Sequence, residues 1–154
     1  MRINDQKSNI FGYIFLLANK LQVAGDHYLS DTNMTIKQWF LMVVIQQFKD
    51  QSPSLREAGD FMGMSYQNVK QLALKLEKNG YLSIHKDEKD ARMLRLLETE
   101  KCNTFWKSRN EEGERFLERM FLDMCDTEIK SLLQSLLKIL DNIEKINGSE
   151  GIQS

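Results

Sequence analysis

The sequence has few of the residues that break helices, pair as disulfides or span membranes. One proline and eight glycines among 154 residues exclude a β architecture rich in tight turns, so helices should dominate. The two cysteines, Cys102 and Cys125, lack the spacing of a disulfide framework or zinc site. No apolar run approaches the roughly 18 residues that cross a bilayer, and the N-terminus does not resemble a signal peptide. We expect a cytoplasmic protein without a membrane partner, cofactor or metal.

The charge is nearly balanced over the whole chain but is unevenly distributed along it. There are 21 basic and 22 acidic side chains, a net charge of −1. Residues 64–95 carry seven basic against four acidic side chains, whereas the residues from 96 onward carry eight against twelve. Because the position of positive charge matters more than its sum, the middle segment is the candidate for binding a polyanion.

Three helices are predicted in the first 62 residues. Residues 10–30 are apolar on nearly every side, which predicts a helix that needs burial on more than one face, with a partner subunit as one source of cover. Two capping boxes follow, Thr35 with Gln38 and Ser54 with Glu57. They predict one helix that ends near residues 48–51 and a second, shorter helix that ends at residue 62.

A third helix follows directly after a glycine turn. Gly63 is placed to supply a positive φ at the end of the preceding helix, and Ser65 is placed to cap the next one. The new helix should stop at Asn79-Gly80. Its apolar residues repeat at i, i+3, i+4 and i+7, as an amphipathic helix requires: Val69, Leu72, Ala73 and Leu76.

The hydrophobic period then changes from that of a helix to that of a strand. Residues 81–86 alternate apolar and polar side chains, and residues 92–97 can return as a second strand after a charged tip. Helix, turn, helix and hairpin in this order predict a winged helix-turn-helix. Residues 100–124 and 126–147 are again helical in pattern, with a wide apolar stripe in the second segment, and residues 148–154 are predicted to be a flexible tail.

Two polar surfaces of this module are candidates for DNA contact, although a solvated face and a solvated turn are the simpler interpretations. The polar face of the third helix can reach phosphates and base edges in the major groove; it consists of Ser65, Tyr66, Gln67, Asn68, Lys70, Gln71 and Lys75. The hairpin can place Arg92 in the minor groove, with Asp90 holding it by a charge-assisted hydrogen bond. The wing residues proposed for contact are Lys86, Lys89, Asp90 and Arg92.

These motifs together resemble the multiple-antibiotic-resistance regulator (MarR) family. The resemblance rests on Thr35-x-x-Gln38-Trp39, on Met64-Ser65 with Leu76-Glu77-Lys78-Asn79-Gly80, and on Asp87-x-Lys89-Asp90-x-Arg92. It covers residues 10 to 145 and implies a mainly α fold of about six helices plus a two-stranded β-wing. Two departures from the family pattern concern the DNA-contact set: Lys89 stands where the family has an arginine, and Gln71 stands where an arginine is frequent, which makes the set less basic than is usual.

The resemblance implies how the chain is divided and what it binds. Residues 35–99 would form the DNA-binding region, and residues 1–34 and 100–147 would form a dimerisation region. A homodimer would then bind a pseudo-palindromic operator in double-stranded DNA, with half-sites about 34 Å apart. Family members are often repressors that a small aromatic ligand releases. The dimerisation candidates are Ile10, Ile14, Leu132, Leu136, Leu140 and Ile143.

Other interpretations stay open at this stage. Aromatic residues of the first two predicted helices could line a ligand pocket, although aromatics at helical spacing more often form the core: Phe11, Phe15, His27, Tyr28, Trp39 and Phe40. A winged-helix module can also bind another protein. A redox-sensing regulator would use Cys102, whose pKa the adjacent Lys101 would lower if the thiol were exposed. No catalytic constellation or phosphate-binding loop is present, so we do not expect an enzyme.

Overall fold

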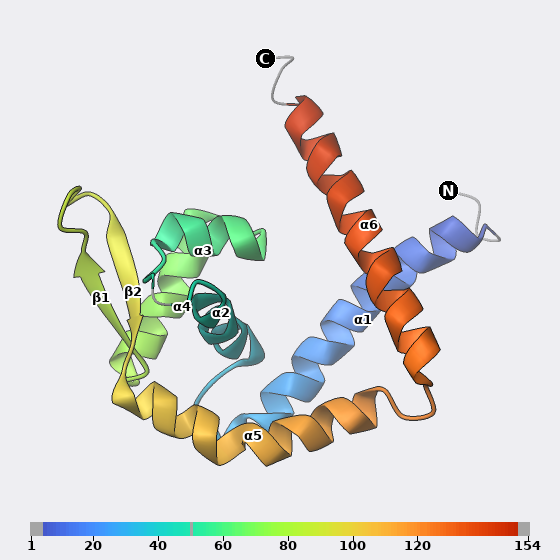
Figure 1. Ribbon diagram of the computed structural model, residues 1–154, viewed down its shortest axis with the longest axis horizontal. Helices are drawn as coiled ribbons and strands as arrows, with labels where there is room; N and C mark the ends of the chain where they lie inside the picture. Colours follow the sequence, from blue (N-terminus) through green and yellow to red (C-terminus); the bar gives the residue numbers. More distant parts are fainter. Residues whose placement is uncertain (1–4, 50, 151–154) are drawn as a thin grey trace. The chain divides into compact units, whose positions relative to one another are not determined.

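The computed structural model describes residues 5–49 and 51–150, which form six α-helices, one short 3₁₀ helix and one two-stranded sheet (Figure 1). In chain order these are α1 (Gln6–Tyr28), η1 (Ser30–Thr32), α2 (Ile36–Gln47), α3 (Leu55–Met62), α4 (Tyr66–Lys78), β1 (Leu82–Lys86), β2 (Leu94–Glu98), α5 (Glu100–Met120) and α6 (Asp126–Glu150). The predicted fold class, mainly helical with a two-stranded wing, is confirmed.

The chain divides into two compact units, residues 1–107 and 108–154. The first unit holds the winged helix-turn-helix and the buried core. The second holds the C-terminal part of α5 and all of α6. No helix within residues 5–49 and 51–150 is both long enough and apolar enough to cross a membrane.

Side-chain caps start α2 and α3 where the sequence predicts them. The Thr35 hydroxyl accepts from the Gln38 N–H at 3.3 Å, and the Gln38 side chain accepts from the Thr35 N–H at 2.9 Å. At α3, Ser54 and Glu57 exchange the same pair of bonds at 3.1 and 2.7 Å. Both capping boxes therefore satisfy N–H groups that the helix cannot bond internally. Gly63 ends α3 with φ of +64°, a left-handed conformation that glycine adopts without strain.

The core of the first unit forms where α2, α3 and α4 meet the hairpin. In the predicted stripe of α4, Val69, Ala73 and Leu76 are fully buried, and Leu72 packs against them while partly exposed. Leu41 of α2 and Leu96 of β2 are also fully buried. Because the helices present their apolar sides to one centre, the polar side of α4 is left at the surface.

The hairpin is an antiparallel pair in which Ile84 lies opposite Leu96. The Leu96 N–H donates to the Pro53 carbonyl at 2.9 Å, and Ser54 forms a bridge with Arg95, so the base of the hairpin is attached to the segment before α3. The second strand begins at residue 94, not at 92 as predicted. The prediction was wrong there because the Met93 N–H turns back to the Asp90 carbonyl at 2.8 Å and belongs to the tip.

Three predicted boundaries of the outer helices also differ from the structure. α1 begins at Gln6, four residues earlier than predicted, with Asp5 as its N-cap. α5 ends at Met120 and not at 124, where a turn with Asp123 at φ of +64° interrupts the helix. α6 continues through Gly148 to Glu150, beyond the predicted end of the helical segment at residue 147, and residues 151–154 lie outside the described residues. The flexible tail stays a prediction. A single helical glycine costs only about 1 kcal/mol and does not by itself end a helix.

Truncation of a core side chain in α4 tests this packing. Leu76→Ala should lower the free energy of unfolding by about 3 kcal/mol, because it removes a fully buried side chain and leaves a cavity. Leu74→Ala is the matched control on the same helix, where the side chain is 40% exposed, and it should cost about 1 kcal/mol or less. Urea unfolding at one fixed protein concentration measures both changes. Equal losses in the two variants would contradict the assigned orientation of α4.

Candidate nucleic-acid interface

The polar side of α4 is the first part of the candidate interface. Ser65 caps the helix by accepting from the Asn68 N–H at 3.3 Å, so the first turn is well formed. Six of the seven residues proposed from the sequence are exposed: Ser65, Tyr66, Gln67, Asn68, Gln71 and Lys75. Lys70 is half-buried at the border of this face. The exposed side therefore presents amide and ammonium groups that can meet base edges and phosphates.

The other side and the C-terminal end of α4 are held in place. α4 contacts α2, α3 and β1. At its end, Glu77 accepts from the Ile84 N–H of β1 at 2.9 Å, and the Asn79 side chain donates to the Asn33 carbonyl at 3.2 Å. Gly80, with φ of +80°, then turns the chain into the hairpin. The helix and the wing are consequently connected both by the chain through Gly80 and by the hydrogen bond from the Ile84 N–H to the Glu77 side chain.

The wing tip presents an arginine that its own turn holds in position. Arg92 donates to Asp90 Oδ1 from its backbone N at 3.0 Å and from Nε at 3.1 Å, and its second terminal nitrogen lies 3.3 Å from Oδ2. The predicted hydrogen bond between these residues is present, and it lowers the pKa of Asp90. The Arg92 side chain is 92% exposed, and Lys86 and Lys89 are also exposed. Three cationic side chains of the hairpin are therefore accessible.

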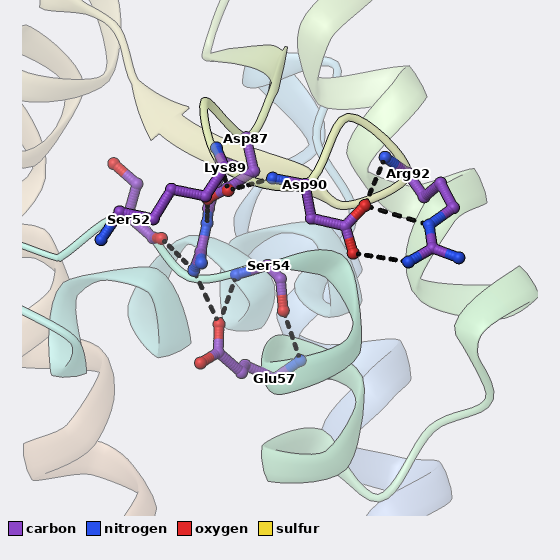
Figure 2. A network of polar contacts seen from close by, with 8 residues as sticks. Ser52, Ser54, Glu57, Asp87, Lys89, Asp90 and Arg92 are labelled. Carbon is purple, nitrogen blue, oxygen red and sulfur yellow. Dashed lines mark hydrogen bonds and ion pairs between the residues drawn. The ribbon is translucent and has the colours of Figure 1, made fainter.

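A second network behind the tip was not predicted from the sequence (Figure 2). Asp87 Oδ1 accepts from the N–H groups of Lys89 and Asp90, both at 2.9 Å, and Oδ2 accepts from Arg95 Nε at 2.7 Å. One terminal nitrogen of Arg95 donates to the Ser52 carbonyl at 3.1 Å and to Glu57 Oε2 at 3.0 Å. The network therefore links the wing tip to the start of α3.

The network explains the electrostatics of its members. Hydrogen bonds from Arg95 and from the N–H groups of Asp90 and Lys89 lower the pKa of Asp87 to about 2. The Ser54 N–H, with Arg95, lowers the pKa of Glu57, and Asp87 raises the pKa of Arg95. Each group is stabilised in its charged form, so the network is formed throughout the physiological pH range.

The residues proposed for a ligand pocket lie at several different places in the first unit. Phe11 and Phe15 contact each other edge to face at 5.1 Å on an exposed stretch of α1. Trp39 packs edge to face on Trp106 of α5 at 6.1 Å and belongs to the margin of the core, as does Tyr28. His27 and Phe40 are exposed. The pocket stays a prediction.

The dimerisation candidates are apolar side chains left at the surface of each unit. Ile10 and Ile14 of α1 are 51% and 38% exposed. On α6 the four candidates are also exposed: Leu132, Leu136, Leu140 and Ile143. Apolar surface of this extent on two long helices is typical of an interface.

The structure contradicts the redox interpretation of Cys102. The thiol is fully buried, donates to Glu98 Oε1 at 3.2 Å, and has its pKa raised by burial and by that carboxylate. Lys101 points elsewhere: its ammonium donates to the Asn79 carbonyl at 2.6 Å and lies 4.5 Å above the Tyr81 ring. A buried, protonated thiol is a poor nucleophile, so Cys102 does not meet the condition of exposure on which the redox alternative depended. Cys125 is exposed.

The geometry defines a winged helix-turn-helix protein, and comparisons place its fold more narrowly. No protein-family model matches the chain. A MarR protein from Peptoclostridium difficile has a TM-score of 0.82, is 23% identical, and is matched over 94% of both chains. A MarR/EmrR family regulator from Acinetobacter has a TM-score of 0.79 at 18% identity, over 92% of this chain and 99% of its own. The transcriptional activatory protein BadR of Rhodopseudomonas palustris is 22% identical over 91% of this chain and 81% of its own.

The chain therefore has the fold of the MarR-family transcriptional regulators, and the resemblance drawn from its motifs is confirmed.

The depressed pKa of Asp87 can be measured directly. The Asp87 carboxyl should titrate near pH 2, and Arg95→Met should move the midpoint up toward the ordinary value of roughly 3.9. Because the folded-state pKa is lowered, the stabilisation is fully present above the unfolded-state value and is lost as the pH falls through about 2. Carboxyl-detected NMR titration of both proteins checks this. An identical midpoint in the variant would contradict the assigned role of Arg95.

Proposed function

We propose that this protein is a DNA-binding transcriptional regulator of the MarR type that acts as a homodimer on a pseudo-palindromic operator. The observation that carries the proposal is the joint exposure of the polar side of α4 and of Arg92 at the wing tip. One connected module holds both elements, so a single binding event can use both. The fold that this chain shares with the MarR protein and the sequence similarity to BadR support the same class of function.

In this proposal α4 enters the major groove with its N-terminal end. Gln67, Asn68 and Gln71 are exposed amides that can donate to and accept from an adenine edge in a bidentate manner. Lys75 is placed farther along the helix, where an ammonium can contact a phosphate. The buried side of α4 sets which of these groups face outward, so the contact set is determined before DNA is bound.

The wing contacts the minor groove through Arg92. Its guanidinium is almost completely exposed, and Asp90 reduces the number of conformations that it can adopt. A narrow minor groove has an enhanced negative potential, which attracts an inserted arginine. Lys86 and Lys89 can add phosphate contacts on either side.

Self-association accounts for the apolar surface of α1 and α6. Monomeric soluble proteins rarely expose large apolar patches, because leaving apolar surface in contact with water costs roughly 25 cal/mol per Å² relative to burying it. A second copy with the same apolar helices can cover them through a two-fold interface. A two-fold dimer presents two α4 helices, and this predicts an operator with matching two-fold symmetry.

The direction of regulation depends on where the operator lies. The sequence resemblance favours repression, whereas BadR is named an activator. Both effects would use the same contacts, and a reporter with the operator placed over or upstream of a promoter separates them. Control by a small aromatic ligand is supported by BpsR of Bordetella bronchiseptica, in which 6-hydroxynicotinic acid regulates DNA binding. The candidate ligand-binding residues of this chain are the aromatic residues and His27 of α1 and α2 named for the pocket.

The alternative of a protein-binding winged helix predicts a different dependence on salt. DNA binding through several lysine and arginine contacts releases counterions and weakens steeply as salt increases. A protein interface formed by amide and apolar groups lacks that steep dependence.

Selection of binding sites from random duplex DNA tests the proposed function. We expect enrichment of a two-fold symmetric site, with affinity that falls as salt rises from roughly 50 to 200 mM. Arg92→Ala and Lys75→Ala should each weaken binding about tenfold without lowering the melting temperature by more than a few degrees. Lys130→Ala, an exposed lysine of α6, is the control that should bind normally. A folded dimer that enriches no sequence would support the protein-binding alternative.

A charge placed in the apolar stripe of α6 tests dimerisation separately. Leu136→Asp should shift the protein toward monomer or unfold it, since association would bury an unpaired carboxylate. Gln134→Asp introduces the same charge at an exposed polar position of the helix and should leave the dimer intact. Light scattering and circular dichroism at matched concentrations report assembly and folding. Unchanged dimerisation of Leu136→Asp would show that this stripe lies outside the interface.

A further inference from the structure

We propose that Arg95 is a positioning residue that holds the wing tip against the start of α3 and thereby determines where Arg92 meets the DNA. The inference rests on the proposed DNA-binding function. It assigns to Arg95 a role in DNA binding that requires no DNA contact of its own.

The wing tip depends on Asp87. One carboxylate oxygen of Asp87 accepts from the N–H groups of Lys89 and Asp90, which closes the turn. The backbone adds bonds from the Asp87 N–H to the Met93 carbonyl at 2.9 Å and from the Met93 N–H to the Asp90 carbonyl at 2.8 Å. Asp90, the residue that orients Arg92, is therefore a member of the turn that Asp87 organises. A rotation of Asp87 would carry Arg92 with it.

Asp87 in turn contacts Arg95. The other carboxylate oxygen of Asp87 lies 2.7 Å from Arg95 Nε, and the two side chains are 18% and 32% exposed, respectively. Solvent therefore screens this ion pair less than it screens the more exposed pair of Asp90 and Arg92. The guanidinium presents a different nitrogen to the Ser52 carbonyl and to Glu57. A planar group with several donors can make these contacts simultaneously, whereas a lysine ammonium on a flexible chain cannot reproduce their geometry.

The segment that Arg95 contacts at the start of α3 is itself held by hydrogen bonds. Glu57 accepts from the Ser54 N–H at 2.7 Å as part of the α3 capping box, and the Leu96 N–H bonds to the Pro53 carbonyl at 2.9 Å. Arg95 therefore joins the tip to a segment of backbone that has hydrogen bonds of its own to α3 and to β2. Without the guanidinium, the tip would sample more orientations, and the apparent affinity for DNA would fall with the fraction of molecules that present Arg92 correctly.

The first test needs no DNA. Arg95→Met should accelerate hydrogen exchange at the Lys89 and Asp90 amides by about tenfold or more in the free protein, since their acceptor loses its support. Arg95→Lys should give an intermediate rate, and exchange in α4 should not change. Arg115→Met, which removes an exposed arginine of α5, is the matched control and should leave the tip amides at the wild-type rate. Tip exchange that is unchanged in Arg95→Met would overturn the inference.

The second test is a double-mutant cycle on the selected operator. Arg92→Ala alone should weaken binding about tenfold, and Arg95→Met alone should produce a similar loss. The double variant should bind about as well as Arg92→Ala alone, because Arg95 acts through Arg92. If the two losses instead multiply, Arg95 does not position Arg92 and the inference fails while the proposed function stands. If Arg92→Ala has no effect, the proposed wing contact and this inference both fail.

Discussion

The burial of one side of α4 is the constraint on which the rest of this structure depends. Val69, Ala73 and Leu76 are completely removed from water against α2, α3 and the hairpin. Rotating the helix by one residue, about 100°, would expose these side chains and bury amides and ammonium groups without partners. Burial of the apolar side of α4 therefore fixes the orientation of the helix, and its polar groups face the solvent as a consequence. The proposed DNA contacts follow from the packing.

The wing depends on the same module through charged groups that serve two purposes. Glu57 caps α3 and also receives Arg95, while Asp87 closes the tip turn and also binds Arg95. Each carboxylate has a lowered pKa because it accepts several hydrogen bonds as an anion. The position of the hairpin is thus coupled to the start of α3, whose first turn is held by its own capping box. A mobile hairpin would present Arg92 in many orientations, and this one restricts them.

Prediction from the sequence succeeded where the interacting groups are close in the chain. The capping boxes span three residues, the stripe of α4 repeats every three or four, and Asp90 orients Arg92 two residues away. It failed for helix ends that depend on the surroundings, such as the end of α5 at Met120. Where such a helix ends depends on segments that are distant in the chain, and no local pattern specifies them.

The order of elements, the caps, the turn glycines and the apolar sides of the helices can all be predicted from the sequence, because each follows from backbone geometry and hydrophobicity within a few residues. The contacts of Arg95 with Asp87, Ser52 and Glu57 depend on the folded chain, since Glu57 is 38 residues away in the sequence. An arginine in an alternating strand pattern looks like any solvated side chain. Its partners are set by the hairpin register, which places Arg95 2.7 Å from Asp87, and by the contact of the hairpin with the start of α3, which places Arg95 3.0 Å from Glu57.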